Sequence, residues 1–234
     1  MIYGHIGARR GSQGLKSKNS KCMLGKPLIQ WSIEQALQCG EIDKVFISTD
    51  DPDIADLAIS LGCEVPGLRP GDLATSEVGK FQVWQHSLCE FMNNECDIFV
   101  DLDCTSPLRD VSDITNAIKL YRDRDSTVDA VMSVAESRKN PYFNMVEERL
   151  DGTLMISKLE NDKRFIRTRQ TSPRVLDHVA SIYVLDPGFI RRCSHLMEGR
   201  LIGYDIGVDK SFDIDSAFDF ALVEFLMRRK HVCE

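Results

Sequence analysis

Hydrophobic positions along the chain follow two alternating patterns. Short apolar runs that end in polar turns predict strands, and longer stretches with apolar residues at helical spacing predict helices. The predicted strands cover residues 1–8, 44–50, 63–68, 97–103, 129–136, 179–186 and 201–208, and the predicted helices cover 27–40, 51–62, 81–92, 112–123 and 215–229. This alternation predicts an α/β fold, with a mostly parallel, twisted sheet and helices on both of its faces.

The alternation is interrupted near residue 138. Residues 140–159, "NPYFNMVEERLDGTLMISKL", alternate in polarity around Asp151-Gly152, a pair typical of hairpin turns. We therefore expect a hairpin arm at about residues 138–170, inserted in a single domain that covers residues 1–234. An arm that leaves an α/β core commonly pairs with a second subunit, so the pattern also indicates a homodimer.

Composition and charge narrow the function classes. The chain has 234 residues with 29 basic and 36 acidic side chains, so we expect no nucleic-acid-binding surface and only local basic clusters. The 8 cysteines show neither a C-x-x-C pair nor zinc-ligand spacing, which predicts reduced thiols in a cytoplasmic protein. The first apolar run is too short for a signal peptide, and none approaches the ~18 residues of a membrane span. A cytoplasmic protein without membrane partners is therefore expected.

Ligands of parallel α/β sheets bind at the carboxyl ends of the strands. Residues 7–19, 48–51 and 101–109 lie at such ends of predicted strands and are therefore the candidate ligand-binding segments. The first stretch, "GARRGSQGLKSKN", combines glycines with two arginines and two lysines. Glycine lets the backbone approach an anion that cations neutralise, so this loop suits phosphate binding. It contains neither the Walker pattern nor G-x-G-x-x-G, and a solvated basic loop is the alternative.

Two aspartate pairs are candidate metal ligands. Asp213 and Asp215, in "SFDIDSAFD", would point to one side of an extended segment, where a cation such as Mg²⁺ would offset their repulsion. Alternatively, one of them caps the last helix. Asp101 and Asp103 form a D-x-D pattern that is similar to the metal-binding motif of many nucleotide-sugar glycosyltransferases, or they simply end a strand.

Three arginines follow the predicted hairpin, at positions 164, 167 and 169. Arginine forks suit a carboxylate or a phosphate, and a solvated charged stretch is the alternative. The five histidines show no paired metal spacing, and no G-x-S-x-G elbow is present. We therefore expect no nucleophilic triad.

Several stretches, taken together, resemble one family. In chain order they are "ARRGSQGLKSKN", "GKPLIQWSIEQAL", "VFISTDDPDIADLA", "LRPGDLAT", "TSPLRDVSDI", "ASIYV" and "SFDIDSAFDF". Over nearly its whole length the chain is similar to the CMP-sialic acid synthetases, or acylneuraminate cytidylyltransferases. "DLDCTSPLRD" and "RKNPYFNMVE" most resemble the branch that activates legionaminic acid and related nonulosonic acids. The resemblance implies a Rossmann-like nucleotidyltransferase fold.

The resemblance also implies a reaction. CTP and an acidic nine-carbon sugar would give the CMP-sugar and pyrophosphate, with Mg²⁺, or Mn²⁺, carrying the charge that develops at the α-phosphorus. By position, the implied nucleotide-binding residues are Arg9, Ser12, Gln13, Lys18, Asn19 and Arg69. Asp213 and Asp215 would hold the metal, and Arg9, Lys18 and Asp215 would take part in catalysis.

The resemblance assigns a sugar side as well. Lys80, Asp103, Arg169, Gln170 and Tyr183 occupy the positions implied to bind the sugar. The arm at residues 138–170 resembles the family's dimerisation segment, which reaches into the sugar pocket of the neighbouring subunit.

Four positions depart from the family's pattern. Gln13 stands where a lysine is usual, which removes a charge that Lys16 could supply instead. Val179 stands where an asparagine is usual, and Asp103 replaces a glutamine. Lys80 stands where other members often have serine. These departures bear most on the identity of the sugar.

Three other functions are also compatible with the sequence. A synthetase for the eight-carbon sugar KDO would use the same chemistry. A glycosyltransferase would use Asp101 and Asp103 as a metal site and would consume a nucleotide sugar without releasing pyrophosphate. A catalytically silent homologue would bind the nucleotide without turnover, and Gln13 is the feature that favours it.

Overall fold

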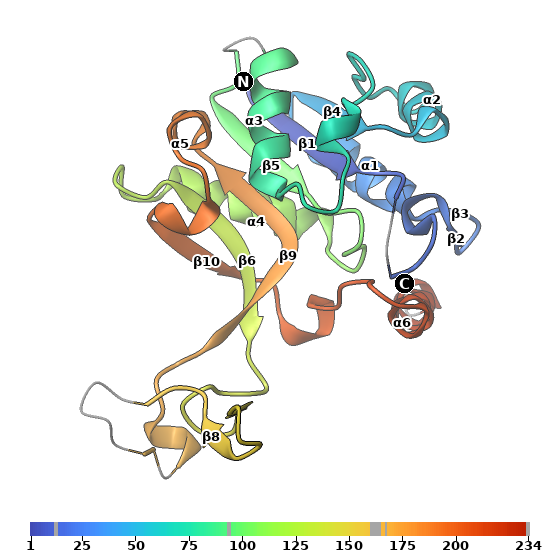
Figure 1. Ribbon diagram of the computed structural model, residues 1–234. Coiled ribbons are helices and arrows are strands. Elements are labelled where there is room, and N and C mark those ends of the chain that lie inside the picture. The colour runs from blue at the N-terminus through green and yellow to red at the C-terminus, as the bar shows by residue number, and fades with distance from the viewer. Residues whose placement is uncertain (12–13, 93–94, 160–164, 167, 233–234) are drawn as a thin grey trace.

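A six-stranded sheet forms the centre of the computed structural model, which describes residues 1–11, 14–92, 95–159, 165–166 and 168–232 (Figure 1). The strands follow the order β10-β6-β9-β5-β1-β4, and β9 alone runs antiparallel to its neighbours. Their bounds are β1 (Ile2–Ala8), β4 (Lys44–Thr49), β5 (Ile98–Leu102), β6 (Ala130–Glu136), β9 (Leu176–Leu185) and β10 (Leu201–Asp205). The predicted α/β fold with a mostly parallel sheet is confirmed.

Helices cover both faces of this sheet. On one face lie α1 (Leu28–Gln38), α2 (Pro52–Ser60) and α4 (Val111–Arg122), and on the other lie α3 (Lys80–Glu90) and α5 (Pro187–Arg192). Since side chains alternate along a strand, β1 contributes Ile6 to the first core cluster and Tyr3 to the second. His5 and Gly7 therefore share the face that carries α3.

A third hydrophobic cluster packs the C-terminal helix against residues near the N-terminus. It joins α6 (Ala217–Val232) to a small hairpin of β2 (Cys22–Met23) and β3 (Lys26–Pro27), with Met23 and Val223 both fully buried. The extended segment before α6 is fixed by a hydrogen bond from the Ile214 N–H to the Thr105 carbonyl at 3.0 Å. This packing places the segment beside the loop that follows β5.

Most of the predicted elements are present, with three differences. The strand predicted at residues 63–68 is wrong: only Glu64 pairs, in an isolated bridge with Phe46, and Pro66 has no N–H for a ladder. The β2–β3 hairpin and α5 were not predicted. The short 3₁₀ helices are Lys18–Ser20, Gly71–Leu73, Arg169–Thr171, Leu196–Glu198 and Val208–Lys210.

The predicted hairpin at Asp151-Gly152 is confirmed. Strand β7 (Val146–Glu148) pairs antiparallel with β8 (Leu154–Ile156), and Gly152 adopts φ +79°, which glycine tolerates in a tight turn. Figure 1 shows the segment between β6 and β9, to which this hairpin belongs, standing away from the sheet. The 7 cysteines in the described ranges carry free thiols. Within those ranges, every helix is too short or too polar to span a bilayer.

Candidate active site

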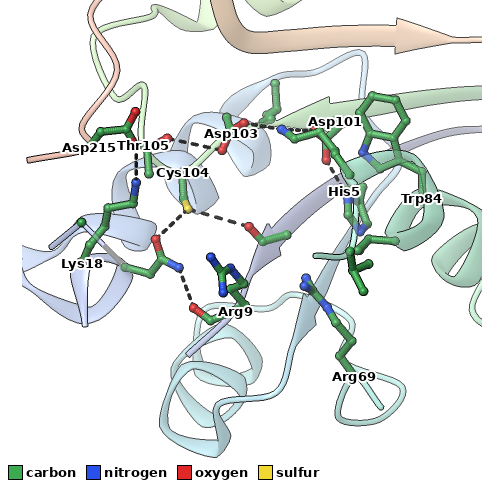
Figure 2. A pocket seen from close by; sticks show the side chains of 17 residues that line it. His5, Arg9, Lys18, Arg69, Trp84, Asp101, Asp103, Cys104, Thr105 and Asp215 are labelled. Atoms are coloured by element: carbon green, nitrogen blue, oxygen red, sulfur yellow. Dashed lines mark hydrogen bonds and ion pairs between the residues drawn. The ribbon is translucent and has the colours of Figure 1, made fainter. Parts of the chain in front are cut away.

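A cavity of about 340 Å³ opens at the carboxyl ends of β1 and β5. It brings together most of the residues that the sequence singled out (Figure 2). Its lining residues are His5, Gly7, Arg9, Gly14, Lys18, Asn19, Arg69, Val78, Lys80, Val83, Trp84, Asp101, Leu102, Asp103, Cys104, Thr105 and Asp215. Two of the three predicted strand ends, residues 7–19 and 101–109, therefore contribute to one cavity. The third, residues 48–51, contributes indirectly, because Ser48 binds the lining residue Arg69.

Arg9 and Arg69 lie on one side of the cavity, across from Asp103 (Figure 2). Arg69 is 7 % exposed, and its guanidinium donates to the Ser48 hydroxyl at 3.0 Å and to the Ser48 carbonyl at 2.5 Å. Gly7 leaves room for it, since a Cβ there would lie 3.3 Å from Arg69 Nη2. Burial lowers the pKa of Arg69. Within the described part of the chain neither arginine forms an ion pair, although the charges of Asp50 and Asp101 act on Arg69.

Lys18 and Gly14 connect the opening loop to the segment before α6. Lys18 Nζ donates to the Ile214 carbonyl at 2.6 Å and to Asp215 Oδ1 at 3.0 Å. Gly14 packs so closely on the Asp215 carbonyl oxygen that a Cβ would overlap it. Asn19 donates to the Arg9 carbonyl at 3.1 Å, which stabilises the turn of the loop. The predicted phosphate loop and Asp215 thus form one unit.

Asp213 and Asp215 have the features of a cation site. Asp213 Oδ1 is buried without a hydrogen-bond partner, whereas the Asp215 side chain is 79 % exposed and lines the cavity. Burial raises the pKa of Asp213, and the charges of Asp103 and Asp215 raise it further. A hydrogen bond from Thr105 and the charge of Lys18 oppose this shift in the pKa of Asp213, and a bound cation would oppose it further. Among the described residues, no group of three or more His, Cys, Asp or Glu side chains is arranged to hold a metal ion by itself.

Lys80 lines the cavity together with Asp101 and Asp103. Its ammonium donates to Asp101 Oδ2 at 3.1 Å and forms a short contact with Asp103. It also lies 4.8 Å from the centre of the Tyr183 ring, whose hydroxyl bonds to His178 Nε2 at 2.9 Å. One ammonium therefore bridges the two aspartates of the D-x-D pair.

His5 is a site residue that sequence reasoning missed. It is 1 % exposed, and its Nδ1 lies 2.6 Å from Asp101 Oδ1. Burial lowers the pKa of His5 even though Asp101 opposes the shift. For Asp101, burial favours a raised pKa, but the Lys80 charge and the His5 hydrogen bond hold it well below its usual range. A histidine within an apolar strand, two residues before Gly7, was the available signal.

Some predicted site residues lie elsewhere or outside the described residues. Gln170 belongs to the short helix Arg169–Thr171 in the arm and does not line this chain's cavity. Val179 is 4 % exposed and packs in the hydrophobic core. Ser12, Gln13, Arg164 and Arg167 lie outside the described residues.

The burial of His5 predicts a pH-dependent stability. The pKa of His5 in the folded protein lies below the ordinary 6.5. Its contribution to the free energy of unfolding is therefore present above pH 6.5 and is lost as the pH falls below that value. The loss is at most about 1.4 kcal/mol per pH unit. Urea unfolding at pH 7.5 and 5.5 should show a smaller pH dependence for His5→Asn than for wild type. Equal slopes would contradict the account.

A mostly parallel sheet with basic side chains and an aspartate around a cavity at its strand ends fits a nucleotidyltransferase, the class that the family model and the relatives indicate. The chain belongs to the cytidylyltransferase family, whose model matches residues 5–184.

Named relatives of similar sequence support membership in the cytidylyltransferase family. The chain is 34 % identical to the post-translational flagellin modification protein B of Campylobacter coli, with 97 % of this chain and 95 % of that protein covered. It is 32 % identical to the CMP-N,N'-diacetyllegionaminic acid synthase of Campylobacter jejuni, with the same coverage. It is 30 % identical to the N-acylneuraminate cytidylyltransferase of Escherichia coli O18:K1:H7, covering 98 % of this chain and 53 % of that protein.

Solved structures share the fold. A CMP:2-keto-3-deoxy-manno-octonic acid synthetase complexed with CTP has a TM-score of 0.74 at 18 % identity, covering 98 % of this chain and 100 % of that one. A 4-diphosphocytidyl-2C-methyl-D-erythritol synthase from Anaerococcus prevotii has a TM-score of 0.67 at 11 % identity, covering 97 % and 98 %. At these identities the likeness concerns the fold.

Proposed function

We propose that the chain transfers the cytidylyl group of CTP to an acidic nine-carbon sugar, a legionaminic or sialic acid-like nonulosonic acid, giving the CMP-sugar and pyrophosphate. The observation that carries the proposal is the cavity itself, where Arg9, Lys18 and Arg69 face Asp103 and Asp215. The names of the relatives at 30–34 % identity support the sugar class. The KDO synthetase, at 18 % identity, is a weaker guide to the substrate.

In this proposal the residues of the opening loop hold the nucleotide. Arg9 and Lys18 bind the triphosphate, Asn19 and Arg69 bind the nucleoside, and Ser12 and Gln13 contribute from the same loop. The sugar's anomeric hydroxyl attacks the α-phosphorus in line with the departing pyrophosphate. Because sugar and triphosphate are both anionic, cations on both sides are needed to bring them together.

Enzymes of this family generally use a divalent metal ion. We propose Mg²⁺, with Mn²⁺ as the alternative, held by Asp213 and Asp215. A divalent ion there would supply positive charge next to the reacting phosphate. Asp215 contributes the exposed carboxylate that faces the cavity, and Lys18 holds it in place.

The sugar would occupy the end of the cavity near Lys80, Asp103 and Tyr183. Arg169 and Gln170 would reach it from the arm of a second subunit in a cytoplasmic homodimer formed through residues 138–170. Exposed apolar side chains on the arm, such as Leu154 and Phe165, support an interface there.

A nucleotide panel tests the nucleotide half of the proposal. Calorimetric titration in the presence of Mg²⁺ should show CTP binding at least about tenfold more tightly than UTP, ATP or GTP, since a site that hydrogen-bonds a base rejects the wrong one. Equal affinities for all four nucleotides would contradict a cytidylyltransferase site.

The replacement of the family's lysine by Gln13 gives a further prediction. Gln13→Lys should leave kcat/KM unchanged or raise it, because an added cation near the triphosphate contributes about 1–3 kcal/mol at most. Pyrophosphate release at saturating sugar and varied CTP measures the effect. A large loss of activity would show that Gln13 makes a specific contact with the substrate.

A further inference from the structure

A continuous series of hydrogen bonds lies behind the sugar side of the cavity. Ser87 Oγ, on α3, lies 3.0 Å from His5 Nε2, and His5 Nδ1 lies 2.6 Å from Asp101. The other oxygen of Asp101 accepts from Lys80, and Lys80 binds Asp103. The side chains of His5 and Asp101 are 1 % and 3 % exposed, whereas those of Lys80 and Asp103 are 36 % and 17 % exposed. The series therefore leads from the protein interior to the cavity.

The protons in this series can be assigned. The Asp101 carboxylate only accepts, so the proton of a neutral His5 sits on Nδ1, and Nε2 accepts from the Ser87 hydroxyl. Burial favours neutral His5 by lowering its pKa, while the two aspartates keep the pKa of Lys80 well above its ordinary value despite its partial desolvation. The cluster thus carries two negative charges and one positive charge.

The two aspartates consequently compete for a single ammonium. The His5 N–H gives Asp101 a second donor, and this leaves Lys80 free to hold Asp103 at the same time. Without that donor, Asp101 would be a buried carboxylate with Lys80 as its remaining partner in the series, and the cost of such a charge would draw the ammonium toward it. Asp103 would then lose its contact with Lys80, which holds it at the cavity wall.

We propose that His5 and Asp101 are positioning residues that fix Lys80 against Asp103, and that Asp103 selects the sugar by accepting a hydrogen bond from it. This inference rests on the proposed function. Among the described residues, the hydrogen bond found for Asp103 Oδ1 is a long one from the Thr105 hydroxyl, at 3.4 Å, which leaves acceptor capacity for a substrate. The excess negative charge favours a hydroxyl, an amide N–H or an ammonium group at this point of the sugar. It disfavours a carboxylate, which must bind elsewhere.

The test compares His5→Phe with a matched control, Tyr3→Phe. Tyr3 lies two residues earlier on the same face of β1, and its hydroxyl bonds to Glu95 at 3.0 Å, outside the cavity. His5→Phe should raise KM for the sugar about tenfold, the loss expected for one hydrogen bond to a charged group, with KM for CTP changed less than about twofold. Tyr3→Phe should leave both KM values within about twofold of wild type.

Two further variants exclude a merely structural effect. His5→Asn keeps an N–H near the position of Nδ1 and should recover most of the sugar KM. In a Lys80→Ser/Asp103→Gln background, His5→Phe should add no further change, because the competition for the ammonium is gone. Should His5→Phe fail to fold, as judged by thermal unfolding, Ser87→Ala should raise the sugar KM by a smaller factor of about three.

The outcomes separate the two claims. An active wild type in which His5→Phe matches Tyr3→Phe, or raises both KM values equally, overturns the inference and leaves the proposed function intact. An undiminished effect of His5→Phe in the double-variant background also overturns it. A wild type that releases no pyrophosphate with any nonulosonic acid overturns the proposed function, and the inference with it.

Discussion

Replacing Asp215 by asparagine should lower turnover by about 10²–10³-fold or more while CTP binding is retained. The asparagine side chain would be neutral and a poorer ligand for a hard cation, so the charge needed near the reacting phosphate would be lost. CTP binding should survive because Arg9 and Arg69 are untouched. Lys18 would also be released from its 3.0 Å contact with Asp215 and become available to the triphosphate.

Pyrophosphate release and CTP calorimetry on the same preparation measure the two effects of Asp215→Asn. Asp209→Asn is the matched control, since Asp209 is an exposed aspartate in the same part of the chain that does not line the cavity. The control should behave as wild type. Turnover of Asp215→Asn near the wild-type level would show that the proposed metal ligand is wrongly assigned.

Gly14→Ala should lower kcat/KM by about 10²-fold in a protein that still folds. A Cβ on Gly14 would overlap the backbone carbonyl oxygen of Asp215, and neither backbone can yield by a simple side-chain rotation. The opening loop and the segment before α6 would have to separate. Arg9 and Lys18 would then no longer lie correctly relative to Asp215.

The same loop supplies a control for Gly14→Ala. A Cβ on Gly11 would meet its nearest neighbour, Arg9 Nη1, at 3.9 Å, an ordinary contact distance. Gly11→Ala should therefore change kcat/KM by less than about threefold. Equal losses for the two alanine variants would indicate that the loop needs glycine for backbone freedom, and the close contact with Asp215 would not be the cause.

Much of the fold followed from the hydrophobic pattern, and the exceptions have physical reasons. The β2–β3 hairpin was missed because its turn places Leu24 at φ +50° beside Gly25, and leucine rarely signals such a conformation. The direction of β9 was not predictable, because parallel and antiparallel strands between covered faces show the same apolar run. Pro66 should have argued against a strand at residues 63–68.

The site was predictable to the extent that its residues lie at strand ends. The opening loop and Asp103 satisfied that rule, and the structure brings both to one cavity. The partners of Lys80 and His5 were not predictable, since the latter's bond to Asp101 joins residues 96 positions apart. The alternation of side chains along a strand assigns each one to a face of the sheet. Its partners on that face depend on which strand lies next to it, and the sequence pattern does not give this.

A chain that makes a CMP-sugar from CTP converts a triphosphate into a phosphodiester and pyrophosphate. The most direct measurement is a ³¹P NMR time course of CTP and Mg²⁺ with a panel of nonulosonic acids, including legionaminic and N-acetylneuraminic acids. The triphosphate signals should fall while a phosphodiester and pyrophosphate rise in equal amounts with at least one sugar. Persistence of the triphosphate with every sugar, in a protein that binds CTP, would contradict the proposed function.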